Sequence, residues 1–277
     1  MTRDSSYRAG VVPDERVSEV SRRLRSRCDA ILGVVWFMPE AADLPSLAAR
    51  VACLGRVPGA AAAALLAPLP AEATARAVDD GWRAAEPDEL LARRLEGATS
   101  FLARVLGDRP DGLERAVALL RRTVEDAPLE GHPVFAGLRS LPWPGTPLGD
   151  LWRASDMVRE RRGDSHRNAW TAAGLSSLEI QLLTERWRTS PNPGSTTAEQ
   201  MGWPAHEIDA ALDGFRGRGW VDDAAELTEA GRAFREDIEL ATDRQERALV
   251  EALGDDVDEL FALLTPWTKA LVATFTA

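Results

Sequence analysis

Residues 176–243 decide the fold class, and they read SSLEIQLLTERWRTSPNPGSTTAEQMGWPAHEIDAALDGFRGRGWVDDAAELTEAGRAFREDIELATD. Ser176 to Glu179 form a capping box, in which a serine hydroxyl caps a helix and the glutamate reaches back to the cap. Thr197 to Gln200 repeat that pattern after a run of turn formers at 190–195. This order predicts a helix, a polar loop and a second, short helix.

A third helix and a small wing follow in the same stretch. Pro204 suits the first turn of a helix, and apolar residues then recur on one face as far as Phe215. Two short extended segments around an acidic turn, at 220–227, predict a small β-wing, and Thr228 caps an exit helix. Together these elements predict a winged helix-turn-helix.

The remainder of the chain is predicted to be helical, because amphipathic segments alternate with proline and glycine breaks and strand patterns are almost absent. Gly163 is expected to end a helix that begins at Pro147, with Asp164 capping the next one. The fold class is therefore mainly α. The expected organisation is a disordered N-terminus at 1–10, a multi-helix domain at 11–146, connecting helices at 147–175, the winged helix-turn-helix at 176–243 and a helical tail at 244–277.

The composition argues against several classes of protein. The 277 residues contain no long charge-free apolar run and no apolar signal core at the start, so neither a membrane span nor secretion is expected. Cys28 and Cys53 lack metal-ligand spacing, and free buried thiols are expected. The three histidines lie far apart, and no P-loop, Rossmann or nucleophile-elbow pattern occurs. We expect a cytoplasmic protein without a metal or cofactor, and no enzymatic activity is predicted.

The negative charge is concentrated in the second half of the chain. Residues 1–150 carry 19 Arg against 21 Asp and Glu, whereas residues 151–277 carry 13 Arg and one Lys against 23 Asp and Glu. The net charges are −2 and −9, which together give the −11 of the whole chain. Because duplex DNA is bound largely through cationic contacts to phosphates, the acidity of this half argues against DNA binding.

The predicted recognition helix at 204–218 carries the candidate DNA contacts. Its outward positions include three acidic residues, which are unfavourable near phosphates. Only four side chains, on this helix and at the start of the preceding one, suit contacts to phosphates or base edges. These candidates are Thr197, Gln200, Arg216 and Arg218.

A second candidate site lies in the polar run RERRGDSHR at 159–167. One interpretation is a capped helix junction with solvated arginines. The other is a ligand site, in which Asp164 orients His166 and an arginine holds an anion or carboxylate. The apolar cluster that contains Trp36 either packs in the core or forms the wall of an apolar pocket. The candidate ligand-binding residues are Trp36, Arg161, Arg162, Asp164 and His166.

The same junction carries a resemblance to a known family. Arg162-Gly163-Asp164-Ser165-His166, together with the flanking Leu151-Trp152-Arg153 and Ala172-Ala173-Gly174-Leu175, resembles a family of uncharacterised actinobacterial helix-turn-helix proteins with a MarR-like winged helix. The segments at 227–231 and 241–243 resemble the wing and exit helix of MarR-type domains. The likeness spans most of the chain, and it implies a role in transcription regulation through DNA binding.

Three functions remain open at this point, of which the last is a purely structural interaction protein; the first two come from different classes. The first is a regulator-like protein, whose N-terminal helices bind a small molecule or mediate homodimerisation while the winged helix contacts duplex DNA. The second is a protein that does not bind DNA and uses the winged helix as a scaffold or dimer module beside a small-molecule site or an active site. The exposure and charge of the recognition helix discriminate between the first two.

Overall fold

The computed structural model describes residues 12–33, 43–188 and 197–275. The predicted disordered N-terminus and Trp36 lie outside these residues. Within them the fold is mainly α-helical, as predicted, and no strand forms. The helices are α1 (Asp14–Leu32), α3 (Ser46–Val51), α4 (Gly59–Leu66), α5 (Ala71–Ala84), α6 (Pro87–Leu106), α7 (Leu113–Glu125), α8 (Pro133–Ser140), α9 (Pro147–Ala172), α10 (Ser177–Trp187), α11 (Ala205–Gly217), α12 (Glu229–Gln245), α13 (Arg247–Leu253) and α14 (Val257–Phe275). Short 3₁₀ helices, η2 (Ala52–Leu54) and η3 (Gly254–Asp256), extend α3 and precede α14.

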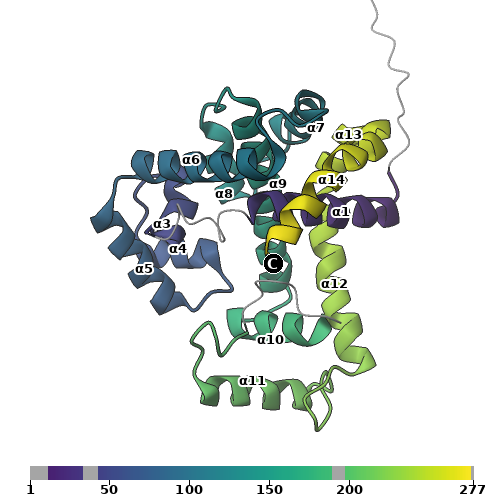
Figure 1. The fold of residues 1–277 in the computed structure, drawn as a ribbon. Coiled ribbons are helices and arrows are strands. Elements are labelled where there is room, and N and C mark those ends of the chain that lie inside the picture. The colour runs from purple at the N-terminus through teal and green to yellow at the C-terminus, as the bar shows by residue number, and fades with distance from the viewer. Residues whose placement is uncertain (1–11, 34–42, 189–196, 276–277) are drawn as a thin grey trace, which may run out of the picture.

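Helix α9 runs through the middle of the molecule (Figure 1). The Thr146 hydroxyl caps its start by accepting from the Gly149 N–H, and Pro147 occupies the first turn. Side chains around nearly the whole circumference of α9 are buried, against α1, α6, α7, α8 and α12. The predicted break at Gly163 is wrong, because α9 continues for 26 residues. A glycine costs a helix only about 1 kcal/mol, which burial on all sides outweighs.

The largest hydrophobic core surrounds the first half of α9. It joins α1, α6, α7 and α8 to the C-terminal helices α13 and α14. Trp152 and Phe135 are among its largest fully buried side chains. Cys28 and Cys53 are both free and buried, as predicted, and burial raises the pKa of each thiol to about 12.

A smaller core holds α3, α4 and α5 together beside α6 (Figure 1). The alanine-rich helix α4 packs closely on α5, and the backbone of the two helices approaches at Gly59. A Cβ atom at that position would lie 2.3 Å from the carbonyl oxygen of Ala75. Within the described residues no single helix is long and apolar enough to cross a membrane; one sharply bent pair, Ser46–Leu54 with Gly59–Leu66, passes the same test by length and composition.

The third core belongs to the helix-turn-helix unit, which consists of α10, α11 and the first half of α12. The Ser176–Glu179 capping box forms as predicted, and both of its hydrogen bonds are present. The expected β-wing is reduced to one antiparallel bridge between Val221 and Leu227. The Asp222 N–H bonds the Glu226 carbonyl oxygen at 2.9 Å on one side of this bridge, and the Thr228 N–H bonds the Trp220 carbonyl oxygen at 3.0 Å on the other. The pairing stops there because Thr228 already caps α12.

Two glycines of this unit give a matched test of its packing. A Cβ atom on Gly231, at the start of α12, would lie 2.1 Å from the Trp220 carbonyl oxygen. Gly231→Ala should therefore lower the free energy of unfolding by about 1–3 kcal/mol. Gly214, inside α11, has no atom within 4 Å of such a Cβ, so Gly214→Ala should raise it by about 0.5–1 kcal/mol. Urea unfolding measures both, and equal effects would contradict the close approach at Gly231.

Candidate nucleic-acid interface and the buried charge network

Helix α11 lies at the end of the molecule farthest from α6 and α7 (Figure 1). Its inner face packs through Ile208, Leu212 and Phe215 on the core of the helix-turn-helix unit. The outward positions of the helix, from His206 to Arg216, are exposed. No described helix of the N-terminal part or of the tail covers this face, so it is free to meet a partner.

The two arginines predicted to contact DNA are each paired with an acidic side chain. Arg216 donates to Asp213 at 2.7 Å, one turn earlier on α11. Arg218, just beyond the helix, lies 3.0 Å from a carboxylate oxygen of Glu179 and stacks over the Trp220 ring at 4.8 Å. Both guanidinium groups remain exposed at the surface. Exposed pairs of this kind contribute little to stability, and a phosphate can replace the carboxylate.

The other two candidates, Thr197 and Gln200, bond to one another. The Thr197 hydroxyl accepts from the Gln200 N–H at 3.2 Å, and the Gln200 side chain accepts from the Thr197 N–H at 2.8 Å. This is the predicted second capping box, although residues 198–202 form turns rather than a regular helix. Thr197 and Gln200 therefore hold the turn before α11, and their role in DNA binding stays a prediction.

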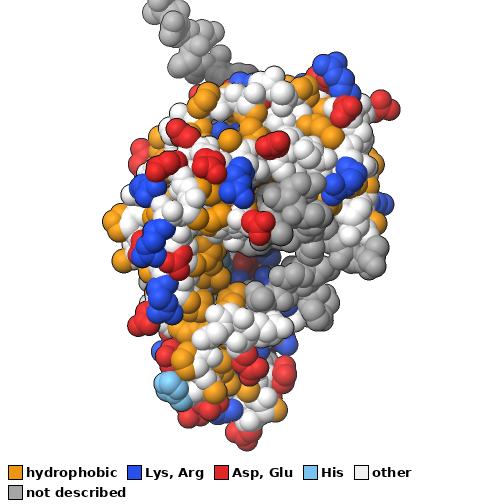
Figure 2. All heavy atoms as spheres, turned by 60° about the vertical axis from the view of Figure 1, so that its left-hand side comes forward, with side chains coloured by type: hydrophobic (Ala, Val, Ile, Leu, Met, Phe, Trp, Pro, Cys, Tyr) orange, Lys and Arg blue, Asp and Glu red, His pale blue; other side chains and the backbone are white. Residues whose placement is uncertain are grey.

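The surface around α11 is acidic. Residues 197–232 carry eight Asp and Glu side chains against three Arg. Acidic side chains gather at the lower end of the molecule in Figure 2, where α11 and its connection to α12 lie. The N-terminal turn of α11, which in helix-turn-helix proteins points at base edges, presents Glu207 with Asp209 close behind. This charge weakens every sequence-independent contact to DNA.

The polar run at 159–167 is part of α9 and lies mostly inside the molecule, where its side chains contact α12. Arg162 is 4% exposed and pairs with Asp243 at 2.6 Å and with Glu239 at 2.8 Å. Arg22 of α1 also bonds Asp243, and Arg235 bonds Glu239. Against the effect of burial, Arg235 and Arg162 keep the pKa of Glu239 well below its usual range.

Arg161 and Asp164 fasten other segments to α9. The Arg161 guanidinium donates to the carbonyl oxygens of Pro128 at 2.5 Å and Gln245 at 3.1 Å. One oxygen of Asp164 accepts the N–H groups of Val134 and Phe135, both at 3.1 Å, and so caps the N-terminus of α8. Burial nevertheless raises the pKa of Asp164.

The expected contact between Asp164 and His166 does not form. The His166 ring faces α12, where Nδ1 lies 3.1 Å from the Thr242 hydroxyl, while Asp164 faces α8 and Arg167. Residues two apart on a helix point in different directions, so the continuity of α9 separates the two side chains. Burial lowers the pKa of His166 to about 3. The four candidates from α9 are thus not gathered around one pocket, and their role in ligand binding stays a prediction.

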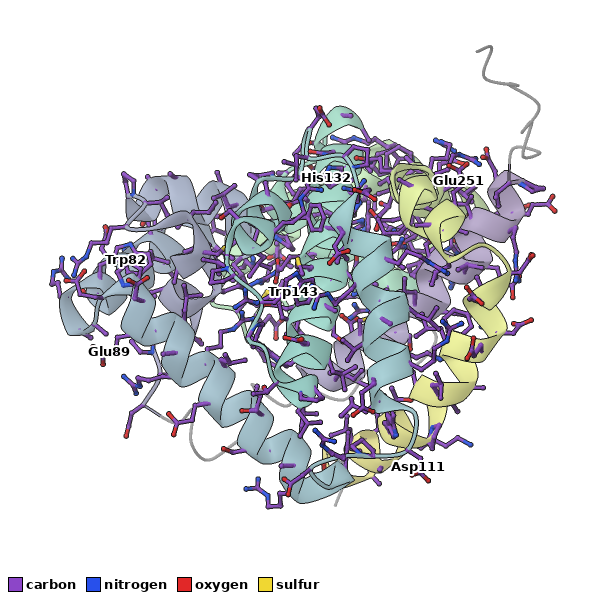
Figure 3. All side chains as sticks on the ribbon, turned by 90° about the horizontal axis from the view of Figure 1, so that it is seen from above. Trp82, Glu89, Asp111, His132, Trp143 and Glu251 are labelled. Carbon is purple, nitrogen blue, oxygen red and sulfur yellow. The ribbon has the colours of Figure 1, made fainter. Side chains whose placement is uncertain are left out.

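A second buried set of hydrogen bonds, which the sequence analysis did not predict, links the start of α8 to the end of α12 through Ser165. The Ser165 hydroxyl donates to Glu246 at 2.6 Å, and its oxygen lies 2.9 Å from Nε2 of His132, which Figure 3 labels. Burial lowers the pKa of His132 to about 4 and raises that of Glu246. Although serine and histidine are in contact, all three residues are buried, and this arrangement fastens helices rather than reaching a substrate. The residues are 33 and 81 positions apart, which hid these hydrogen bonds from motif analysis.

The comparisons with known proteins agree with the architecture at the level of the family. The model of a helix-turn-helix family matches residues 21–276. The chain therefore belongs to this helix-turn-helix family, which confirms the general part of the resemblance drawn from the sequence. Comparison with curated proteins gives no match, and comparison with solved structures gives none.

The lowered pKa values of His166 and His132 predict how the stability of the protein depends on pH. His166 and His132 stay neutral in the folded protein but bind protons in the unfolded chain below about pH 6.5. The unfolded state then holds more protons, so the free energy of unfolding falls as the pH drops from 7 to 5. His166→Gln should reduce this loss by about 1–2 kcal/mol at pH 5, a range set by 1.36 kcal/mol per pKa unit.

Urea unfolding at pH 7 and pH 5 measures this difference. His206→Gln is the matched control, because His206 is exposed on α11 and should leave the acid-induced loss unchanged. If the free energy of unfolding falls by the same amount between pH 7 and pH 5 in the wild type and in His166→Gln, then His166 is not held neutral between α9 and α12.

Proposed function

We propose that the protein is a regulator-like member of its family, of winged-helix type, that contacts duplex DNA through α11. The observation that carries this proposal is the exposed outer face of α11, which no described segment covers. A helix presented in this way by a helix-turn-helix unit fits the major groove of B-DNA.

The charges on the surface of α11 imply an unusual balance between specific and non-specific binding. Arg216 and Arg218, with the exposed Arg232 on α12, supply a small number of cationic contacts to phosphates. Glu207 and Asp209 can accept hydrogen bonds from cytosine amino groups, a contact that discriminates between bases. We therefore expect weak binding to random DNA, with a shallow dependence on salt, and a larger share of the affinity from base contacts.

Control by a small-molecule ligand or by homodimerisation forms part of this proposal. Helix α12 belongs to the helix-turn-helix unit at its start and is held against α1 and α9 further along. The Arg162–Asp243 and Arg162–Glu239 pairs fix that contact. A ligand or a second subunit that changes the packing of the helical domain would therefore change the position of α11.

A second function is supported by the acidity of the unit. With eight acidic against three basic side chains in residues 197–232, the exposed α11 also suits a basic protein surface or a second copy of the chain. In that case the unit is a scaffold or dimer module, and DNA is not its partner.

Binding to random duplex DNA, titrated with salt, tests the first function. We expect detectable binding near 20 mM salt and a logarithmic slope of about −2, because two or three phosphate contacts are available. The double variant Arg216→Ala/Arg218→Ala should lose this binding. Asp209→Asn/Asp213→Asn should strengthen it about tenfold, since each change removes a charge that repels phosphates.

Arg76→Ala is the matched control, because Arg76 is an exposed arginine on α5, outside the helix-turn-helix unit. The affinity of Arg76→Ala for random duplex DNA should equal that of the wild type. Absence of binding by the wild type at 20 mM salt, both to random DNA and to a pool of genomic fragments, would reject DNA binding. A dimer that is disrupted by Asp209→Asn/Asp213→Asn would then support the second function.

A further inference from the structure

A cavity of about 320 Å³ lies at the opposite end of α9 from the helix-turn-helix unit. Its walls come from α7, α8, the start of α9 and the connection between α8 and α9, which carries Trp143 (Figure 3). The volume falls at the lower end of the range for small-molecule sites. The lining residues are Val124, Glu125, Arg139, Leu141, Trp143, Arg153 and Met157.

Arg153 is a buried guanidinium group without a carboxylate partner among the described residues. The residue is 6% exposed, and its one hydrogen bond, to the Pro142 carbonyl oxygen, is long at 3.4 Å. Its Nε atom is buried and has no hydrogen-bond partner. Burying a cation without a partner is unfavourable, so an anion that pairs with Arg153 would remove this cost.

The carboxylates of this region are occupied by other groups. Asp156 forms two hydrogen bonds with Arg94, at 2.6 and 3.1 Å. Glu125 accepts from Arg121 at 3.1 Å, and Asp150 accepts the Gly145 N–H at 2.9 Å. Arg153 therefore has no carboxylate to recruit without breaking an existing pair.

Arg139 adds a second guanidinium group to the cavity. It donates hydrogen bonds to backbone carbonyl oxygens, those of Ala127 and of Glu125, the latter at 3.2 Å. These bonds orient the group but do not neutralise its charge. Among the residues that line the cavity, Arg139 and Arg153 are positively charged and Glu125 is the one acid, which leaves an excess of one positive charge in a chain of net charge −11.

The rest of the cavity wall is apolar. Met157 and Val124 are buried, and Leu141 and Trp143 lie at the more exposed side. The Arg121 guanidinium stacks at 4.1 Å on the Trp143 ring and so holds the indole in place. Such a wall suits a flat or branched hydrocarbon group.

We infer that this cavity binds a small organic monocarboxylate, with its carboxylate between Arg139 and Arg153 and its apolar body against Trp143 and Met157. Planar guanidinium groups match the two oxygens of a carboxylate, and the single excess positive charge matches a monoanion. The site does not include Arg161, Arg162, Asp164 or His166, and it does not depend on DNA binding by α11.

The second cavity, of about 530 Å³ between α1 and α14, is a weaker candidate for a ligand site. Its cations are not buried: Lys269 is exposed, and Arg23 and Arg27 are partly exposed. Arg23 pairs with Glu19 at 2.8 Å, and Arg27 bonds Thr265 at 3.3 Å. Both arginines also stack on Phe261, so the charges are already stabilised.

Calorimetric titration with benzoate, phenylacetate and 1-naphthoate tests the inference on the full chain. Their amides, benzamide, phenylacetamide and 1-naphthamide, have the same shape without the charge. We expect at least one acid to bind with a Kd below about 1 mM and its amide to bind at least tenfold more weakly. Arg153→Met and Arg139→Met should each weaken binding at least tenfold, whereas Arg76→Met should leave it unchanged.

Thermal unfolding without ligand gives a second measurement on the same variants. Because Arg153 is buried without a carboxylate partner, Arg153→Met should unfold at the same temperature as the wild type or higher. Should Arg153→Met fail to fold, the partly exposed Arg139→Met decides the outcome by itself.

Four results would overturn the inference. They are the absence of binding by all three acids up to 10 mM, equal binding of acid and amide, unchanged binding by Arg139→Met, and tighter binding of inorganic phosphate than of any carboxylate. The last would identify a site for small anions in general, without selection for an organic acid.

Discussion

The pairing of Arg162 with Asp243 and Glu239 is the interaction on which the rest of the structure depends. It joins the central helix α9 to α12, and α12 carries the helix-turn-helix unit. Arg22 and Arg235 complete the neutralisation of the two carboxylates, so the ions are buried with partners on α1, α9 and α12. Removing one member would leave a buried charge uncompensated, whereas hydrophobic residues could replace the whole set at little cost in stability. The network therefore links α1, α9 and α12 through buried charges that are paired with one another.

Burial is the property that separates the two candidate sites. Arg161, Arg162, Asp164 and His166 are held between helices, where each contact fastens a neighbouring segment. The surface of α11 is open but acidic, and its arginines are paired weakly enough to exchange partners. Arg153 differs from both groups, because it is buried like the first but has no carboxylate partner.

The parts of the fold that follow from local sequence were predictable. The Ser176 capping box, the Pro204 start of α11 and the Thr228 cap of α12 all act within one turn of a helix, and all three are present. Gly163 and Asp164 misled the prediction, because a glycine–aspartate pair has the same appearance at a helix junction and inside a buried helix. Asp164 does cap a helix, but the helix is α8, thirty residues earlier. The Ser165–His132 contact and the unpaired state of Arg153 depend on segments distant in sequence, which no spacing rule detects.

The continuity of α9 has a mechanical consequence. At 1.5 Å per residue, its 26 residues span about 39 Å without a joint. Arg153 and Met157 lie in its first half. In its second half, Arg162 and His166 contact the later part of α12, and Trp170 packs in the core of the helix-turn-helix unit. A tilt of 5° about one end of a rod of this length moves the other end by about 3 Å, close to the spacing between adjacent base pairs along a DNA duplex. The cavity thus lies beside the first half of one continuous helix, and the helix-turn-helix unit packs on its last turn.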